Sequence, residues 1–208
     1  MQGHNKAFMA NPVQYLSRYT LTVRPPSNLQ SPLRRLDLSD PAKVHQFDLR
    51  PNTWGSELIP FVPHPKTHRF GTQRPINAYF LDYRAEAVRV IPLGNDADYM
   101  FTPVMNGCYF GYGKGQATHV AGDYGRRDAD KQEQAKTALG GAIALGFDSN
   151  PADADEFTIV GVRRPSGWTF YVQGHEMVYE RFGRLQPCFD KGVGAGQILF
   201  EIKGLERG

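Results

Sequence analysis

The alternation of apolar and polar residues predicts a core built mainly from strands. Aromatic and β-branched residues, which favour strands, gather in several short segments from residue 77 onward. The predicted strands cover residues 78–84, 87–91, 98–102, 108–112, 117–121, 157–163, 168–173 and 198–203. Turn-forming residues separate several of them, including the 113–116 segment, which is typical of a hairpin.

One segment has the periodicity of an amphipathic helix. Between residues 128 and 145, apolar residues fall on one helical face, and charged residues, Lys131 among them, fall elsewhere. Asp128 is a predicted N-cap and Gly146 a predicted C-terminal stop. Many strands with one strong helix indicate an α+β fold with a mainly antiparallel sheet.

Residues 1–75 differ from the rest of the chain, because prolines and turn formers interrupt every periodic pattern there. We expect this region to be irregular, with short strands or helices such as 14–24, and to pack on a core formed by residues 76–208. No internal repeat is visible. The sequence therefore predicts a single domain over residues 1–208.

Composition excludes several classes of protein. Hydrophobic residues make up 40% of the 208 residues and charged residues 22%, as in globular proteins. The net charge is only +3 and the basic residues are scattered, unlike those of a nucleic-acid-binding surface. No segment approaches the ~18 apolar residues of a membrane helix, and no secretory signal is visible. We expect a soluble protein that is made in a cytoplasm and contacts neither nucleic acid nor membrane directly.

A thiol and an imidazole lie on neighbouring predicted strands. Cys108 opens one strand directly after Asn106 and Gly107, and His119 lies within the next strand. Cross-strand neighbours have Cβ atoms roughly 4.5–5.5 Å apart, and diagonal neighbours remain within reach. The chain has only two cysteines, so we expect reduced thiols rather than a disulfide framework.

The pair predicts nucleophilic chemistry. A free thiol has a pKa of about 8.5, and a nearby imidazole that takes its proton creates a persistent nucleophile. Gly107 removes side-chain bulk, and the backbone of Asn106 and Gly107 is a candidate for binding an oxyanion. On spacing alone, a buried structural cysteine and a structural histidine are equally good interpretations.

These residues resemble the catalytic motif of the glutamine deamidase family that includes Burkholderia lethal factor and the cytotoxic necrotizing factors, with the chemotaxis receptor deamidases as more distant relatives. The family motif is Leu-Ser-Gly-Cys at the start of a strand, with His on the next strand and, in several members, Thr six residues before Cys. Here the Gly107-Cys108 dipeptide, His119 and Thr102 take these positions, and Met105-Asn106 replaces Leu-Ser.

The resemblance implies a fold and a reaction. The implied fold is α+β, with a sandwich-like mixed, mainly antiparallel β-sheet core flanked by helices. Cys108 would be the nucleophile and His119 the general base, and Thr102 would position the histidine or polarise the site. The reaction would hydrolyse a glutamine side-chain amide of a target protein through a thioester, without cofactor or metal.

The resemblance also implies a biological setting. Family members act on small GTPases or on a translation-initiation RNA helicase, so the chain would be a toxin-like bacterial effector, with inhibition of translation as one outcome. We expect a monomer that is delivered or secreted into target cells without a cleaved signal peptide. Two alternatives remain open: a cysteine peptidase or acyltransferase, and a non-enzymatic protein-binding module in which Cys108 is buried.

Three other patterns are interpreted as structural. His64 and His68 have a spacing that suits zinc on a helix, but the flanking prolines argue against a helix there. The glycines of 111–115 are typical of a hairpin turn, because the segment lacks the ending of a phosphate-binding loop. The glycines of 192–196 precede a strand and indicate a loop.

Overall fold

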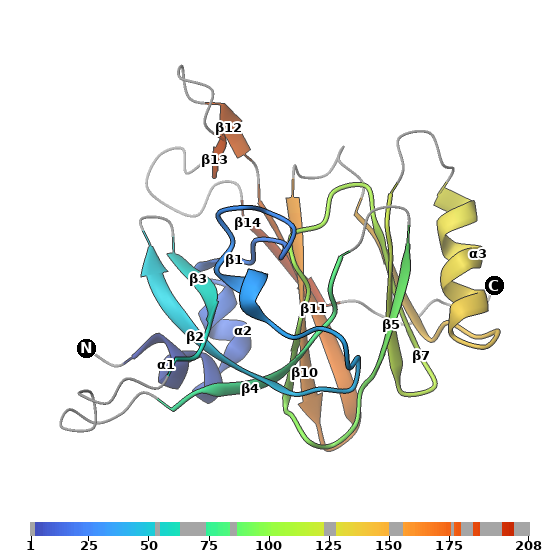
Figure 1. Cartoon of the computed structure of the whole chain (residues 1–208), viewed down its shortest axis with the longest axis horizontal. Coiled ribbons are helices and arrows are strands. Elements are labelled where there is room, and N and C mark those ends of the chain that lie inside the picture. Colours follow the sequence, from blue (N-terminus) through green and yellow to red (C-terminus); the bar gives the residue numbers. More distant parts are fainter. Residues whose placement is uncertain are drawn as a thin grey trace.

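Two packed β-sheets form most of the structure (Figure 1). The structure is a computed structural model, which describes residues 3–52, 55–62, 74–83, 87–122, 128–149, 156–175, 177–179, 185–187 and 197–201. The helices are α1 (His4–Ala10), α2 (Pro12–Leu16), the 3-10 helix η1 (Pro32–Arg35) and α3 (Asp128–Ala138). The strands are β1 (Thr20–Thr22), β2 (His45–Asn52), β3 (Gly55–Pro60), β4 (Ile76–Phe80), β5 (Val88–Pro92), β6 (Tyr99–Phe101), β7 (Tyr109–Gly113), β8 (Gln116–Val120), β9 (Leu145–Asp148), β10 (Glu156–Arg164), β11 (Gly167–His175), β12 (Met177–Tyr179), β13 (Leu185–Pro187) and β14 (Gln197–Glu201).

The larger sheet has eight strands in the order β1-β3-β2-β4-β6-β10-β11-β14. Its neighbours pair antiparallel except β1 with β3 and β4 with β6, which are parallel. The sheet curls, so that β1 returns toward β11, where the buried Gln173 side chain accepts a hydrogen bond of 2.7 Å from the Leu21 amide. Helices α1 and α2 pack against this sheet through Phe8 and Tyr15. The curl makes the sheet nearly a barrel.

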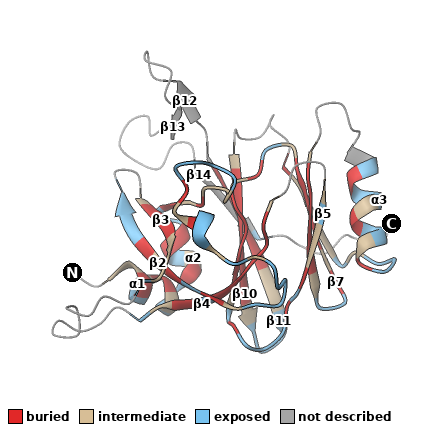
Figure 2. Ribbon diagram, in the orientation of Figure 1, coloured by how far each residue is buried: buried red, intermediate tan, exposed pale blue. Residues whose placement is uncertain are grey.

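The smaller sheet has four antiparallel strands in the order β5-β8-β7-β9. One face packs on the larger sheet, with Phe110 and Ala117 in the same buried cluster as Met100 and Phe170. The other face is covered by α3, whose Ala135 packs near residues of β7 and β8. Figure 2 shows the buried residues of α3 turned toward this sheet. Both faces of the central strands β7 and β8 are therefore largely buried.

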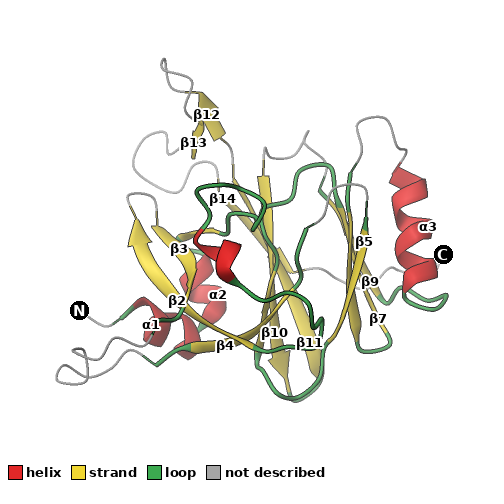
Figure 3. Ribbon diagram, in the orientation of Figure 1, coloured by secondary structure: helices red, strands yellow, loops and turns green. Residues whose placement is uncertain are grey.

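The predicted fold class is confirmed, and Figure 3 shows that strands make up most of the fold. Each predicted strand overlaps an observed strand. The predicted hairpin joins β7 to β8 through Lys114 and Gly115, whose φ angles are 52° and 73°. Positive φ at both central residues is the geometry that matches the twist of paired strands.

Two predictions of local structure need correction. The helix ends at Ala138 instead of continuing to residue 145, because Gly140 and Gly141 adopt φ angles of 71° and 98°, outside the helical region. Gly146, the predicted helix stop, lies within β9. Residues 1–75 are also more regular than predicted, since β1, β2 and β3 are strands of the larger sheet. β2 and β3 pair as sequence neighbours, whereas β1 joins β3 and β2 joins β4 across longer separations that local pattern does not reveal.

Candidate functional site

Cys108 and His119 lie on one face of the β7–β8 hairpin. Cys108 directly precedes β7, and His119 pairs directly with Phe110 across the hairpin. Residues two positions apart on a strand share a face, so Cys108 lies on the face of Phe110 and His119. Cys108 and His119 are consequently diagonal neighbours, and no hydrogen bond joins the thiol to the imidazole.

This face packs against the larger sheet, so the pair is buried. Cys108 is 4% exposed and His119 is 1% exposed. Cys108 belongs to the apolar cluster between the sheets, together with Met105 and Phe157. A substrate would therefore reach the two side chains only after this end of the small sheet opens.

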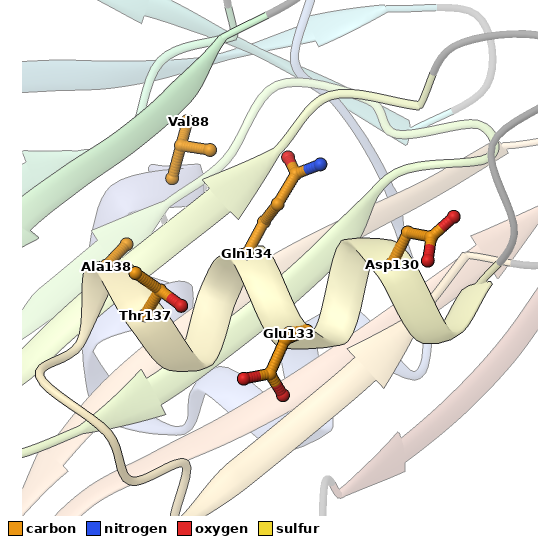
Figure 4. A pocket seen from close by; sticks show the side chains of 6 residues that line it. All are labelled: Val88, Asp130, Glu133, Gln134, Thr137 and Ala138. Carbon is orange, nitrogen blue, oxygen red and sulfur yellow. The ribbon is translucent and has the colours of Figure 1, made fainter.

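Two pockets lined by described residues lie elsewhere. An open groove of about 570 Å³ runs between α3 and Val88 and is lined by Glu133 and Thr137, among others (Figure 4). A smaller, polar pocket of about 230 Å³ is lined by residues such as Arg74, Asp98 and Arg163. Neither pocket is lined by Cys108 or His119.

His119 is a buried imidazole, and the backbone of Asp82 lies close enough to influence its pKa. Neither of its ring nitrogens has a hydrogen-bond partner among the described residues. Its ring packs against Tyr83, with ring centroids 5.6 Å apart. Burial lowers the pKa of His119 to about 4, and the backbone of Asp82 opposes the shift. The ring is therefore neutral near pH 7 and able to accept a proton.

Cys108 is a neutral thiol in this conformation. Burial raises its pKa, while hydrogen bonding by the Gly122 backbone and the positive charge of Lys131 oppose the shift. The thiol donates a long hydrogen bond of 3.7 Å to the Asn106 carbonyl. A nearby imidazole is able to take a thiol proton, but desolvation favours the neutral thiol here. The resting pair is thus thiol and imidazole, not thiolate and imidazolium.

Ser149 holds the backbone around the cysteine. The Gly107 amide donates to the Ser149 carbonyl at 2.8 Å, and the Cys108 amide donates to Ser149 Oγ at 2.7 Å. In return, Ser149 Oγ donates to the Cys108 carbonyl at 2.8 Å. Both amides are occupied in this conformation. The oxyanion role of Gly107 and Asn106 stays a prediction that requires Ser149 to give up at least one of these bonds.

Thr102 lies on the opposite sheet, directly after β6. It is fully buried, and its hydroxyl accepts a hydrogen bond of 3.0 Å from the Ile159 amide of β10. It makes no hydrogen bond to His119, whose nitrogens are unpaired among the described residues. The structure brings Cys108 and His119 together on one face but does not join Thr102 to them, so its positioning role also stays a prediction.

Lys131 is a site residue that the sequence pattern misses. The helical pattern assigns it to the solvated charges of α3, but it is only 4% exposed. Its Nζ donates to the Gly107 carbonyl and to Asp148 Oδ1, each at 3.0 Å. No local signal distinguishes Lys131 from the exposed Lys136 on the same helix, because only the packing of α3 on the small sheet places it beside the turn. Ser149 has no sequence signal either.

Several other candidate residues lie outside the described residues, namely His64, His68, Cys188 and the glycines of 192–196. Within the described ranges, no group of three or more histidine, cysteine or acidic side chains is arranged to hold a metal. None of the described helices is long and apolar enough to span a membrane.

The unpaired, buried His119 predicts a pH-dependent stability. Its folded pKa of about 4 lies below the ordinary 6.5, so between these values the unfolded chain binds the proton more readily. We expect the stability that depends on a neutral His119 to be fully present above pH 6.5 and to be lost as the pH falls through 4. The shift corresponds to about 3 kcal/mol in the free energy of unfolding.

Urea unfolding of the wild-type protein and of a His119→Gln variant between pH 4 and 7 measures this loss. The variant should show a much flatter dependence on pH than the wild-type protein. A His45→Gln variant is the matched control. Burial also lowers the pKa of His45, so His45 should account for part of the pH dependence of stability that remains in the His119→Gln variant. Equal pH dependence in the wild-type and His119→Gln proteins would contradict the prediction.

The described residues thus provide a buried thiol, a neutral imidazole with two unpaired nitrogens, and a glycine turn fixed by lysine and serine. Comparison with known proteins adds no assignment, because no family model and no curated protein matches the chain.

Proposed function

We propose that the chain is a hydrolase that deamidates glutamine side chains of a target protein, with Cys108 as nucleophile and His119 as general base. The observation that carries the proposal is the His119 ring, which is buried on the same sheet face as the thiol and has no partner for either nitrogen among the described residues. Buried polar groups are normally hydrogen-bonded. An unpaired imidazole on the same sheet face as a thiol therefore supports a role for His119 in proton transfer.

The neutral resting pair suits a concerted first step. As Cys108 Sγ bonds to the carboxamide carbon, its proton moves to His119. The C–N bond then breaks, and His119 returns the proton to the departing ammonia, which leaves a thioester. His119 next takes a proton from water, whose oxygen attacks the thioester carbon. Expulsion of the sulfur and return of the proton regenerate the thiol. The overall change is glutamine plus water to glutamate plus ammonia.

Substrate entry requires movement of the protein, because both side chains are buried. In the proposed mechanism, the target protein binds at the Cys108 end of the small sheet and its glutamine separates the hairpin from the facing apolar cluster. The reaction itself uses only the thiol, the imidazole and water, so it needs no cofactor. The resemblance to the lethal factor family supports amide hydrolysis over other thiol chemistry. By the same resemblance, the target is a small GTPase or a translation-initiation RNA helicase and the chain is a toxin-like effector.

Two alternatives use the same residues differently. A cysteine peptidase or acyltransferase would form the same kind of thioester. A protein-binding module would use no chemistry at all, and the burial of Cys108 favours it, because most buried cysteines serve only as small apolar residues.

Mass spectrometry of a eukaryotic protein extract separates these functions. The extract is incubated with the wild-type protein or with a Cys108→Ala variant, and its proteins are then compared. Deamidation converts particular glutamines to glutamates without changing chain length, and only the wild-type protein should do so. Fragments would indicate a peptidase, and added mass an acyltransferase. No covalent change in any protein would leave the binding module as the function.

A further inference from the structure

We infer that Lys131 and Asp148 are a positioning pair that holds the Gly107-Cys108 turn in place and supplies a cation beside the nucleophile. The inference rests on the proposed function, since a fixed turn matters for chemistry only if Cys108 reacts. Neither residue belongs to the motif that identifies the candidate pair.

The pair joins three separate elements. Lys131 comes from α3, and its side chain is 5% exposed. Asp148 is the last residue of β9 and lies opposite Tyr109 of β7. The Lys131 ammonium contacts the Gly107 carbonyl and the Asp148 carboxylate, each at 3.0 Å. Through this one cation, the helix and the edge strand both hold the turn that precedes the nucleophile.

The turn is held from its other side as well. Gly107 has a φ of 69°, a left-handed conformation that favours glycine. Ser149 binds the amides of Gly107 and Cys108, while Lys131 binds the Gly107 carbonyl. The peptide between the two residues is thus fixed at both its oxygen and its nitrogen.

Stability alone is a weak reason for this arrangement. Removing an ammonium from water costs several kcal/mol, and apolar residues of similar volume often replace a buried ion pair without loss. Leucine or methionine in place of Lys131 would fill the space without that cost. A lysine aimed at the carbonyl next to the nucleophile is better explained by what it does to the nucleophile.

The charged and titratable groups around Cys108 give the pair a distinctive signature. Burial raises the pKa of the thiol, the Lys131 cation lowers it, and the Asp148 anion raises it. His119 is neutral near pH 7. Removal of the cation and neutralisation of the anion should therefore change thiol reactivity in opposite directions. Loss of packing alone would not produce opposite signs.

Alkylation of the native protein by iodoacetamide tests the inference, with the Cys108 peptide quantified by mass spectrometry over a range of pH. At a fixed pH below the thiol pKa, Lys131→Met should slow the reaction about tenfold and Asp148→Asn should accelerate it by a similar factor, because a nearby charge moves a pKa by about one unit or more. Lys131→Arg should stay close to wild type. Lys136→Met is the matched control, because Lys136 lies on the same helix with a side chain 49% exposed, and it should change nothing.

Each outcome has a defined meaning. Opposite changes of the alkylation rate in Lys131→Met and Asp148→Asn support the positioning pair. Changes in the same direction, or no change in either variant, overturn it. If Lys131→Met does not fold, the other two variants test the inference. Alkylation should then be faster in Asp148→Asn and close to the wild-type rate in Lys131→Arg. A wild-type Cys108 that never reacts in the folded protein would overturn the inference, because the cation would then have no effect on the resting thiol. The proposed function, in which a bound target opens the site, is decided separately by mass spectrometry of the extract. A reactive wild-type Cys108 that ignores all these variants would overturn the inference alone.

Discussion

Replacement of Cys108 by alanine is expected to lower the rate of glutamine deamidation on the order of 10³-fold or more, while the protein stays folded. The loss is large because no other group forms the thioester, and removal of a catalytic nucleophile typically costs at least this much. Cys108 is a small buried residue, so alanine keeps most of the packing around it. The measurement is the rate of glutamine-to-glutamate conversion in an identified target, with circular dichroism as the check on folding.

Three further variants sharpen this result. His119→Gln should cause a similar loss, because glutamine cannot take the thiol proton. Thr102→Ala should lower the rate less, because a hydroxyl that only positions another residue is rarely indispensable. Cys188→Ser is the matched control and should keep full activity, since the mechanism does not use the second thiol. Substantial activity in folded Cys108→Ala would show that the proposed nucleophile is wrong.

Replacement of Gly122 by alanine is expected to lower the free energy of unfolding by about 4 kcal/mol, at the severe end of single substitutions. A Cβ at this position would lie 1.9 Å from the Gly107 carbonyl oxygen and 2.5 Å from the Gly107 carbonyl carbon. These atoms belong to the backbone, so they cannot rotate away as a flexible side chain would. Relief of the overlap must move the Gly107-Cys108 turn and disrupt its bonds to Lys131 and Ser149.

Gly115→Ala provides the comparison for Gly122→Ala. Gly115 lies at the tip of the hairpin with a φ of 73°, and an added Cβ would meet no heavy atom within 4 Å. Its replacement should cost only the backbone strain, about 1–2 kcal/mol. Urea unfolding of both variants separates the two effects. Equal losses of unfolding free energy in the two variants would mean that the close approach of Gly122 to the Gly107-Cys108 turn does not affect stability. Gly122→Ala should also lose deamidase activity, whereas Gly115→Ala should retain it.

The sequence by itself determined the local features of this protein. Alternation located the strands that carry the candidate pair, and the 113–116 segment predicted their hairpin. The predicted turn made Cys108 and His119 cross-strand or diagonal neighbours, and the observed pairing of Phe110 with His119 places Cys108 on their face, because side chains on a strand alternate with a period of two. Neighbours separated by a tight turn are within the reach of pattern analysis, since the chain between them has few alternatives.

Only the tertiary structure decided what surrounds the pair. Both faces of β7 are buried, one under the larger sheet and the other under α3, so β7 has no polar face from which its orientation could be predicted. The burial of Cys108 and His119 raises one pKa and lowers the other, and this change of electrostatics depends on which sheet they face. The same holds for Lys131, whose partner Gly107 lies 24 residues away. Helical periodicity describes one helix, whereas the environment of a side chain is set by elements that are distant in sequence and packed against it in space.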